Sequence, residues 1–307
     1  MKIAVIGAGA MGSLFAGRLA ERGNEVSLIE VSGVMIDAIE EKGLRMAGLF
    51  GEKAYSLPIA PADHYAEAFE LLIVFTKGMY TTAAMEAAKH LLGPQTWVLT
   101  VQNGIGNVGA IEAFLARDRI VMGMTNWPST LIEPGLITVP GEGEIKVWAA
   151  NGQASARLEA ISRALDEAGL NCKLDPGVEV SIWEKLAFNS ALNSLAAVTG
   201  LTVGEMGDRQ EARDIAFAIV DEVVAVAKAR GLAVDANYVR QSLEHAFANH
   251  RQHQPSMLQD RLAGRRMEIS TITGAVSRAG KTLNVATPVT TTFANLLTIF
   301  DNSGPVA

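Results

Sequence analysis

Apolar and polar positions follow two different patterns along this chain, and each pattern predicts its own kind of domain. In the first half, short runs rich in Val, Ile and Leu alternate with stretches of helical spacing. The apolar runs cover residues 2–6, 25–29, 71–75 and 97–101, and the helical stretches include 11–22 and 82–92. Strands separated by helices are typical of βαβ units, which pair into a parallel sheet. We therefore expect a doubly wound α/β domain here.

The pattern changes after Gly123. Proline and glycine separate short β-prone pieces at 136–139 and 145–148, which we interpret as antiparallel strands added to the sheet. A helix is expected over 156–168, and Asp175-Pro176-Gly177 is a turn that marks the predicted domain boundary. The chain then reads as helices over 180–198, 209–230, 236–249, 256–278 and 288–300. The prediction is an α/β domain over residues 1–175 and an all-helical domain over 176–307.

Composition supports two folded domains and excludes several classes of protein. At about 150 residues per domain, 307 residues fit two, and 49% hydrophobic with 19% charged residues argues against disorder. A net charge of −7 disfavours nucleic acid as a partner. The single cysteine, Cys172, cannot form an internal disulfide and is expected to be a buried filler in a reducing compartment. No membrane or targeting segment is recognisable, so we expect a soluble, cytoplasmic protein without a membrane partner.

A glycine-rich segment follows the first predicted strand. Residues 7–12 read Gly-Ala-Gly-Ala-Met-Gly, a complete G-x-G-x-x-G that opens a helical stretch. The three glycines permit a tight turn, a close approach to a pyrophosphate and close packing of helix on strand. The free N–H groups of the helix start would face the phosphates. We expect a dinucleotide here, contacted by Gly7, Gly9, Ala10, Met11 and Gly12.

An acidic residue stands where such a unit predicts one. Glu30 follows Gly12 by eighteen positions, at the end of the second predicted strand. A carboxylate there accepts hydrogen bonds from an adenosine ribose and repels a 2′-phosphate. Since Val31 and Ser32 come next, we expect NAD(H) to be preferred, with NADP(H) as the other option if Arg45 or Lys53 approaches from a loop. Alternatively, Glu30 is a surface carboxylate at a strand end.

Two more polar residues follow predicted strands. Lys77 comes after the third strand and would bring a cation near the cofactor or an anionic substrate. Asn103 follows the fourth strand and could offer its amide to the nicotinamide ribose or the substrate. Helix capping or a solvated loop explains either residue equally well.

The helix predicted over 180–198 is apolar almost all round, yet it has one polar stripe. Lys185, Asn189 and Asn193 are spaced by four residues, so they lie on one face. Buried amides and ammonium groups need partners. A ligand cleft between the two domains would provide them; a structural hydrogen-bond seam is the alternative.

Further along, Ser256-x-x-Gln259 matches a capping box, which by itself explains both residues. Glu268 could pair with Lys185 or with Arg265 or Arg266. The histidines form no ligand set, so no metal is expected.

Taken in order, these segments resemble the ketopantoate reductase (2-dehydropantoate 2-reductase) family over essentially the whole chain. The resemblance rests on Gly7–Gly12, on the Lys77 and Asn103 segments, and on two further stretches. These are Trp183-Glu-Lys-Leu-Ala-Phe-Asn189 continuing to Asn193, and Ser256-Met-Leu-Gln-Asp260 continuing to Glu268.

The resemblance implies a Rossmann domain, a helical domain that binds substrate and dimerises, and an active site between them. It implies reduction of a 2-oxo acid to the (R)-2-hydroxy acid in pantothenate biosynthesis, by a possible homodimer. Lys185 would be the general acid, and Glu268 would position Lys185 or bind substrate. Asn189, Asn193 and Ser256 would hold the substrate, while Lys77 and Asn103 would contact the cofactor.

The chain departs from the family pattern at several positions. Glu30-Val31-Ser32 stands where NADPH users usually carry a basic residue. Ser270 and Thr273 stand where the family often has Asp and Asn, and Trp127 stands where smaller residues are common. Two alternatives to ketopantoate reduction therefore stay open. One is an NAD-dependent (R)-2-hydroxy acid dehydrogenase for another branched or aromatic 2-oxo acid. The other is a nucleotide-sensing protein that lacks catalysis, against which the Lys185/Glu268 pair speaks.

Overall fold

The computed structural model describes residues 1–303, which separate into two compact units. Unit 1 comprises residues 1–102 and 107–178, and unit 2 comprises residues 103–106 and the chain from Glu179 onward. The predicted domain boundary follows residue 175, and the chain passes from unit 1 to unit 2 three residues later, after residue 178. The segment 103–106 has no counterpart in the prediction. Residues 304–307 of the predicted second domain lie outside the described residues.

The strands of unit 1 form two sheets within the described part of the chain. An eight-stranded sheet has the order β12-β11-β8-β7-β6-β1-β2-β5, and a four-stranded sheet has the order β4-β3-β10-β9. The strand bounds are β1 (Lys2–Ile6), β2 (Glu25–Ile29), β3 (Leu44–Gly48), β4 (Lys53–Tyr55), β5 (Ile59–Ala60), β6 (Phe69–Val74), β7 (Leu92–Thr100), β8 (Ile120–Thr125), β9 (Thr130–Glu133), β10 (Leu136–Val139), β11 (Ile145–Ala149) and β12 (Cys172–Leu174).

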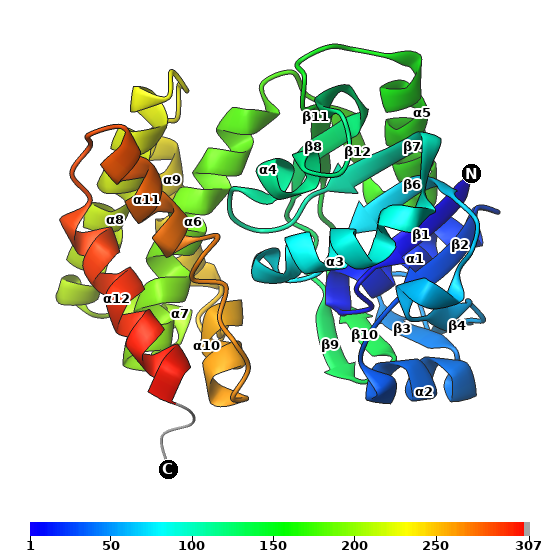
Figure 1. Cartoon of the computed structure of the whole chain (residues 1–307). Helices are drawn as coiled ribbons and strands as arrows, with labels where there is room; N and C mark the ends of the chain where they lie inside the picture. Colours follow the sequence, from blue (N-terminus) through cyan, green and yellow to red (C-terminus); the bar gives the residue numbers. More distant parts are fainter. Residues whose placement is uncertain (304–307) are drawn as a thin grey trace. The chain divides into compact units, whose positions relative to one another are not determined.

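Helices cover both faces of the large sheet (Figure 1). They are α1 (Ala10–Glu21), α2 (Gly33–Lys42), α3 (Thr81–Ala88), α4 (Asn107–Glu112) and α5 (Ala156–Leu165). Because side chains alternate along a strand, Ile3 and Val5 of β1 pack in one apolar cluster with α1 and α5. Ala4 and Ile6 pack in another cluster with α3 and α4. Parallel pairing of β1 with β2 and β6 completes a doubly wound sheet, so the predicted α/β domain is confirmed.

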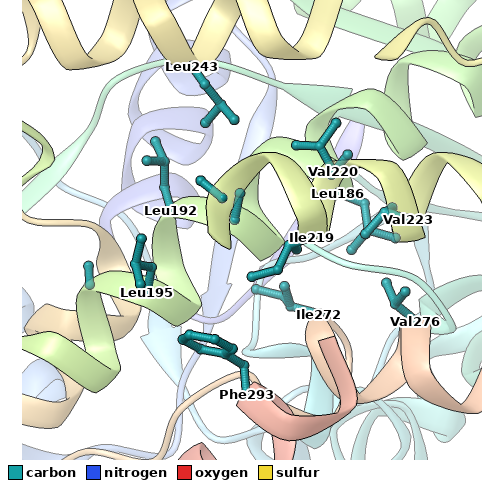
Figure 2. Packing of buried hydrophobic residues seen from close by; sticks show 14 of the residues in the cluster. Leu186, Leu192, Leu195, Ile219, Val220, Val223, Leu243, Ile272, Val276 and Phe293 are labelled. Carbon is teal, nitrogen blue, oxygen red and sulfur yellow. The ribbon is translucent and has the colours of Figure 1, made fainter. Parts of the chain in front are cut away.

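Unit 2 is built from helices around one apolar core. They are α6 (Val178–Thr199), α7 (Val203–Gly207), α8 (Gln210–Ala229), α9 (Ala236–Asn249), α10 (Ser256–Leu262), α11 (Thr273–Thr282) and α12 (Pro288–Ser303). Figure 2 shows Leu186, Leu192 and Leu195 of α6 among side chains of α8, α9, α11 and α12. This confirms the predicted helical second domain. No helix of residues 1–303 is long and apolar enough to cross a membrane.

The strands predicted after Gly123 differ from the prediction in one respect. β11 pairs antiparallel with β8 in the large sheet, as expected. β10 instead belongs to the small sheet, where it pairs parallel with β3 and antiparallel with β9. The prediction is wrong for β10 because its partner β3 lies about ninety residues earlier, and a local apolar pattern carries no information on such pairing.

The predicted helix over 256–278 is also wrong, because the chain forms two helices there. α10 ends at Leu262, and Gly264 adopts a φ of +64°, a conformation typical of glycine after a helix C-terminus. The chain between α10 and α11 still buries Met267 and Ile269 in the core. These buried side chains account for the helix-like apolar spacing of a segment that is not one helix.

Candidate functional site

The glycine loop connects β1 to α1 in unit 1. Gly7 has a φ of +99°, where a side chain would be strained, and its N–H donates to the Ile29 carbonyl at 2.8 Å. A Cβ on Gly12 would lie 1.8 Å from the Gly7 carbonyl oxygen. Gly7 therefore makes the turn and Gly12 allows α1 to approach it, as the glycine spacing predicts.

Gly9 has a different environment, and it bears on a ligand. It is the N-cap of α1, it has no side chain with which to cap the helix, and a Cβ there would meet no atom within 4 Å. The first N–H groups of a helix have no partner within the helix and attract anions. The open space and the donors together suit a dinucleotide pyrophosphate. The start of α1 is also tied to the chain after β8, because Ser129 Oγ donates to the Ala10 carbonyl at 3.0 Å.

Glu30 lies directly after β2, and its carboxylate is held by main-chain donors. Oε2 accepts from the Ala8 N–H at 2.8 Å, and Oε1 accepts from the N–H groups of Val31 at 2.8 Å and Ser32 at 3.0 Å. The carboxylate is thus fixed beside the glycine loop, and Oε2, which accepts a single main-chain donor, keeps a lone pair for a ribose hydroxyl.

The two cations considered as phosphate partners make other contacts. Arg45 pairs with Glu133 at 2.8 Å, and Lys53 pairs with Glu21 on α1. A 2′-phosphate beside Glu30 would therefore have to break one of these ion pairs to gain a cation from this group.

The two polar residues predicted after β6 and β7, Lys77 and Asn103, belong to different units. The two strands are parallel neighbours, with Val74 opposite Thr100. Lys77 lies in the unit 1 loop that leads into a 3-10 turn, whereas Asn103 begins the segment 103–106 of unit 2. In that segment the Ile105 N–H donates to the Thr271 carbonyl at 2.9 Å. Gln102, which directly precedes Asn103, makes side-chain hydrogen bonds to Thr76, Thr81 and Thr100. The sequence pattern did not single out this residue.

The polar stripe lies on α6 in unit 2. Trp183, Leu186 and Leu195 are almost fully buried, so the helix is a buried one, as its apolar pattern predicts. Lys185 and Asn189 keep part of their surface accessible, whereas Asn193 is 5% exposed. The three side chains therefore reach from the edge of the core into it.

The ammonium of Lys185 has an unusual electrostatic environment. Burial lowers the pKa of Lys185 from 10.5 to about 8, and the Glu268 carboxylate opposes that shift. Of the partners considered for Glu268, Arg265 pairs with Asp260 at 2.9 Å and Arg266 with Asp301 at 3.2 Å. The Glu268 carboxylate therefore acts on Lys185 electrostatically, and an ammonium with a pKa of about 8 could release a proton near neutral pH.

Asn193 anchors the start of α10. Its Oδ1 accepts from Ser256 Oγ at 3.1 Å and from the Met257 N–H at 3.0 Å. Because a main-chain N–H is always a donor, the atom facing Met257 must be the amide oxygen. Asn193 therefore holds Ser256, a predicted substrate residue, in place.

The predicted capping box at Ser256 and Gln259 is wrong. Pro255 is the N-cap, Ser256 donates to Asn193, and Gln259 Nε2 donates to the Gln254 carbonyl at 2.7 Å. The sequence pattern fails here because a tertiary partner satisfies the helix start. A capping box does occur at Thr202 and Glu205, at the start of α7.

Trp127 is anchored within unit 1. It is 6% exposed, and its Nε1 donates to the Leu170 carbonyl at 2.7 Å. Its bulk therefore fills an apolar cluster of that unit. As for metals, no three His, Cys, Asp or Glu side chains gather into an ion site among residues 1–303.

Comparisons with known proteins agree on one family. Residues 3–152 match the model of "Ketopantoate reductase PanE/ApbA", and residues 178–300 match "Ketopantoate reductase PanE/ApbA C terminal". A 2-dehydropantoate 2-reductase of Lactococcus lactis subsp. lactis is 35% identical over 294 residues, 94% of each chain.

Two solved structures extend the comparison. The ternary structure of a D-mandelate dehydrogenase with NADH and anilino(oxo)acetate has a TM-score of 0.94 and 32% identity, covering 99% of each chain. A 2-dehydropantoate 2-reductase from Geobacter metallireducens has a TM-score of 0.91 and 28% identity, covering 97% of this chain and 99% of that one.

Proposed function

Since this chain belongs to the ketopantoate reductase PanE/ApbA family, we propose that it reduces a 2-oxo acid to the (R)-2-hydroxy acid with NADH. Ketopantoate is the leading substrate. The observation that supports this most strongly is the Lys185 ammonium, whose pKa is lowered to about 8 beside Glu268. A group of that pKa can both stabilise an oxyanion and release a proton near neutral pH.

Residues of unit 1 would hold the cofactor. The open space at Gly9 and the N–H groups of Ala10, Met11 and Gly12 fit the pyrophosphate, and the fixed Glu30 carboxylate fits the adenosine ribose. Lys77 and Asn103 would contact the rest of the cofactor, towards its nicotinamide end. The bound nicotinamide would supply the hydride that reduces C2 of the substrate.

Lys185 would do the proton chemistry. As the carbonyl oxygen of the substrate gains negative charge, the Lys185 Nζ stabilises it and then donates a proton to it. Glu268 holds the ammonium in its charged form against the effect of burial. The proposal requires the Lys185 Nζ to reach the carbonyl oxygen on C2, while C2 itself receives the hydride.

Three further side chains would hold the substrate. Asn189 lies one turn beyond Lys185 on α6 and can offer its amide directly. Ser256 is exposed and oriented by Asn193, so these two residues would act together. Polar groups that a correct substrate satisfies give strong discrimination, because an analogue without the matching group leaves them unpaired.

The preference for NADH rests on Glu30. Its carboxylate would lie close to a 2′-phosphate, and like charges in proximity repel. Fluorescence titration should therefore give a lower Kd for NADH than for NADPH. In Glu30→Gln the ratio of the Kd for NADPH to the Kd for NADH should decrease by about tenfold, the equivalent of ~1.4 kcal/mol. Glu25→Gln, an exposed change at the start of the same strand, is the control. NADPH bound as tightly as NADH by the unmodified protein would contradict the preference.

An aromatic 2-oxo acid is the second candidate substrate. The D-mandelate dehydrogenase structure was obtained with NADH and anilino(oxo)acetate, and it is 32% identical to this chain. Mandelate is a 2-hydroxy acid with a phenyl group, so the same scaffold accepts an aromatic acid in that protein. The reaction and the role of Lys185 would be unchanged.

A substrate panel tests the proposal. Ketopantoate, benzoylformate, 4-methyl-2-oxopentanoate and pyruvate would each be assayed with NADH and with NADPH, by loss of absorbance at the nicotinamide band. The highest kcat/KM is expected for ketopantoate with NADH. A maximum for benzoylformate would establish the aromatic alternative instead. Tight NADH binding without turnover on any acid would contradict an enzymatic function and favour a nucleotide sensor.

The homodimer stays a prediction. Sedimentation velocity at several protein concentrations would give the mass of the assembly in solution, and a concentration-independent monomer would contradict it.

A further inference from the structure

The chain after β7 contains a hydrogen-bond cluster that the proposed reaction leaves without a role. Gln102 is its centre. Gln102 Nε2 donates to the Thr76 carbonyl at 2.5 Å and to Thr81 Oγ1 at 3.0 Å. Gln102 Oε1 accepts from Thr100 Oγ1 at 2.9 Å. Both ends of one carboxamide are therefore used.

The partners of Gln102 come from three elements of unit 1. Thr100 ends β7, Thr76 lies in the loop after β6, and Thr81 is the first residue of α3. Thr81 is fully buried and Thr100 is 4% exposed, so their hydrogen bonds are shielded from water. Removal of a buried partner leaves a polar group unsatisfied, which is costly. The cluster therefore fixes the strand ends and the start of α3 relative to one another.

The cluster continues to the other side of the segment 103–106. Thr81 Oγ1 donates to Asn107 Oδ1 at 3.4 Å, and Asn107 is 5% exposed. Gln102 and Asn107 are the two residues of unit 1 that flank this segment. Thr81 thus contacts the last residue before the excursion into unit 2 and the first residue after it.

The position of Gln102 in the chain links the cluster to the cofactor. Lys77 follows Thr76 by one peptide bond, and Asn103 follows Gln102 by one peptide bond. These are the two residues proposed to contact the cofactor from the ends of β6 and β7. The Gln102 side chain therefore constrains the backbone directly before Lys77 and directly before Asn103.

We propose that Gln102 is a positioning residue for nicotinamide cofactor binding, which acts with Thr81 to hold Lys77 and Asn103 in the geometry that the cofactor requires. Gln102 itself need not touch the cofactor. This inference rests on the proposed function, since it assigns a task to residues around the same site. Positional errors of a fraction of an ångström at such a site reduce binding and rate together.

Three substitutions test the role of Gln102 and Thr81. Gln102→Met preserves length and removes every side-chain hydrogen bond. Thr81→Val removes one hydroxyl at nearly constant volume, and Thr81→Ser restores it. The Kd for NADH by fluorescence titration and the KM for NADH should rise about five- to tenfold in the first two variants, because the residues around the cofactor lose their fixed geometry. Thr81→Ser should behave as the unmodified protein.

Thr96→Val is the matched control. Thr96 Oγ1 donates to the Phe69 carbonyl at 2.5 Å and Thr96 is 1% exposed, so it also joins β6 to β7, but at the start of β6 and the middle of β7. Its loss should lower the melting temperature as much as Thr81→Val does, without changing the Kd for NADH. A structural role alone would move only the melting temperature in all variants.

The outcomes separate this inference from the proposed function. Unchanged NADH binding in both Gln102→Met and Thr81→Val, with the unmodified protein active, overturns the positioning role alone. Equal losses of NADH affinity in Thr96→Val and Thr81→Val also overturn it. NADH binding without turnover by the unmodified protein overturns the proposed function, and the Kd values then decide the role of Gln102. Absence of NADH binding by the unmodified protein overturns both.

Discussion

The two units differ in the kind of chemical group that we propose to act in each. In unit 1 the groups proposed to bind the cofactor are mainly the N–H groups at the start of α1 and the Glu30 carboxylate, which three main-chain N–H groups hold in place. In unit 2 the proposed groups are side chains at four-residue spacing on one buried helix, with Glu268 and Ser256 supplied by later segments. Main-chain groups bind by shape and donor direction, whereas the Lys185 side chain would act through its charge. Substitutions in unit 1 should therefore affect cofactor binding, whereas those in unit 2 should affect catalysis and substrate binding.

The largest effect is expected from Lys185→Met, which removes the proton donor and keeps most of the side-chain volume. General acid catalysis typically contributes about 10²–10⁴-fold, so kcat should fall by that factor. The Kd for NADH should stay within about twofold, because Lys185 is not among the residues proposed to contact the cofactor. Steady-state kinetics and fluorescence titration check the two values. Lys228→Met, an exposed change on α8, is the control. A loss of kcat below about tenfold in Lys185→Met would contradict the assignment of proton transfer to unit 2.

The pH dependence of the rate should follow Lys185. Burial lowers its pKa to about 8, so above that pH the ammonium is lost and kcat/KM for reduction should fall about tenfold per unit. Oxidation of the hydroxy acid needs the neutral amine, so its rate should rise over the same range. Profiles in both directions that move together would contradict the assignment.

Stability should respond with a definite sign. The folded pKa of Lys185 lies below its ordinary value of 10.5, so the unfolded chain binds more protons between about pH 8 and 10.5. The contribution of Lys185 to the free energy of unfolding therefore rises with pH across that window. The difference in free energy of unfolding between the unmodified protein and Lys185→Met, measured by urea unfolding, should therefore change with pH across that window and stay constant below it.

Gly9 and Gly12 offer a matched test within unit 1. A Cβ at Gly12 would collide with the Gly7 carbonyl at 1.8 Å, so Gly12→Ala should destabilise the fold by about 1–3 kcal/mol or more. A Cβ at Gly9 meets nothing, so Gly9→Ala should fold normally and weaken NADH binding about tenfold or more by occupying the pyrophosphate space. Thermal unfolding and NADH titration give both values. Unchanged affinity in Gly9→Ala would mean that no pyrophosphate lies there.

The smallest effect is expected from Asn193→Ala, which releases Ser256 and the start of α10. The KM for the 2-oxo acid should rise about tenfold, near the effect of one or two lost hydrogen bonds, with a smaller change in kcat. If Asn193 acts through Ser256, the double variant with Ser256→Ala should cost less than the sum of the two single variants. Strict additivity would show that Asn193 contacts the substrate independently of Ser256.

Sequence reasoning succeeded where a local pattern has one physical cause. The strand–glycine–helix order around Gly7–Gly12 predicts the turn, since no other residue fits a φ of +99° beside so close a helix. The apolar spacing of α6 predicts a buried helix with a polar stripe. It failed where a distant segment supplies the partner. β10 pairs with β3, and Asn193 rather than Gln259 satisfies the start of α10.

The sequence by itself determined the α/β-then-helical order, the glycine loop and the polar stripe on a buried helix, because these depend on side-chain size, spacing and type. Only the tertiary structure decided how the individual polar side chains are held. It fixed Glu30 by three main-chain donors, buried Lys185 beside Glu268, and joined Gln102 to Thr76, Thr81 and Thr100. Hydrogen bonds and burial depend on which distant residues meet, and no local pattern contains that information.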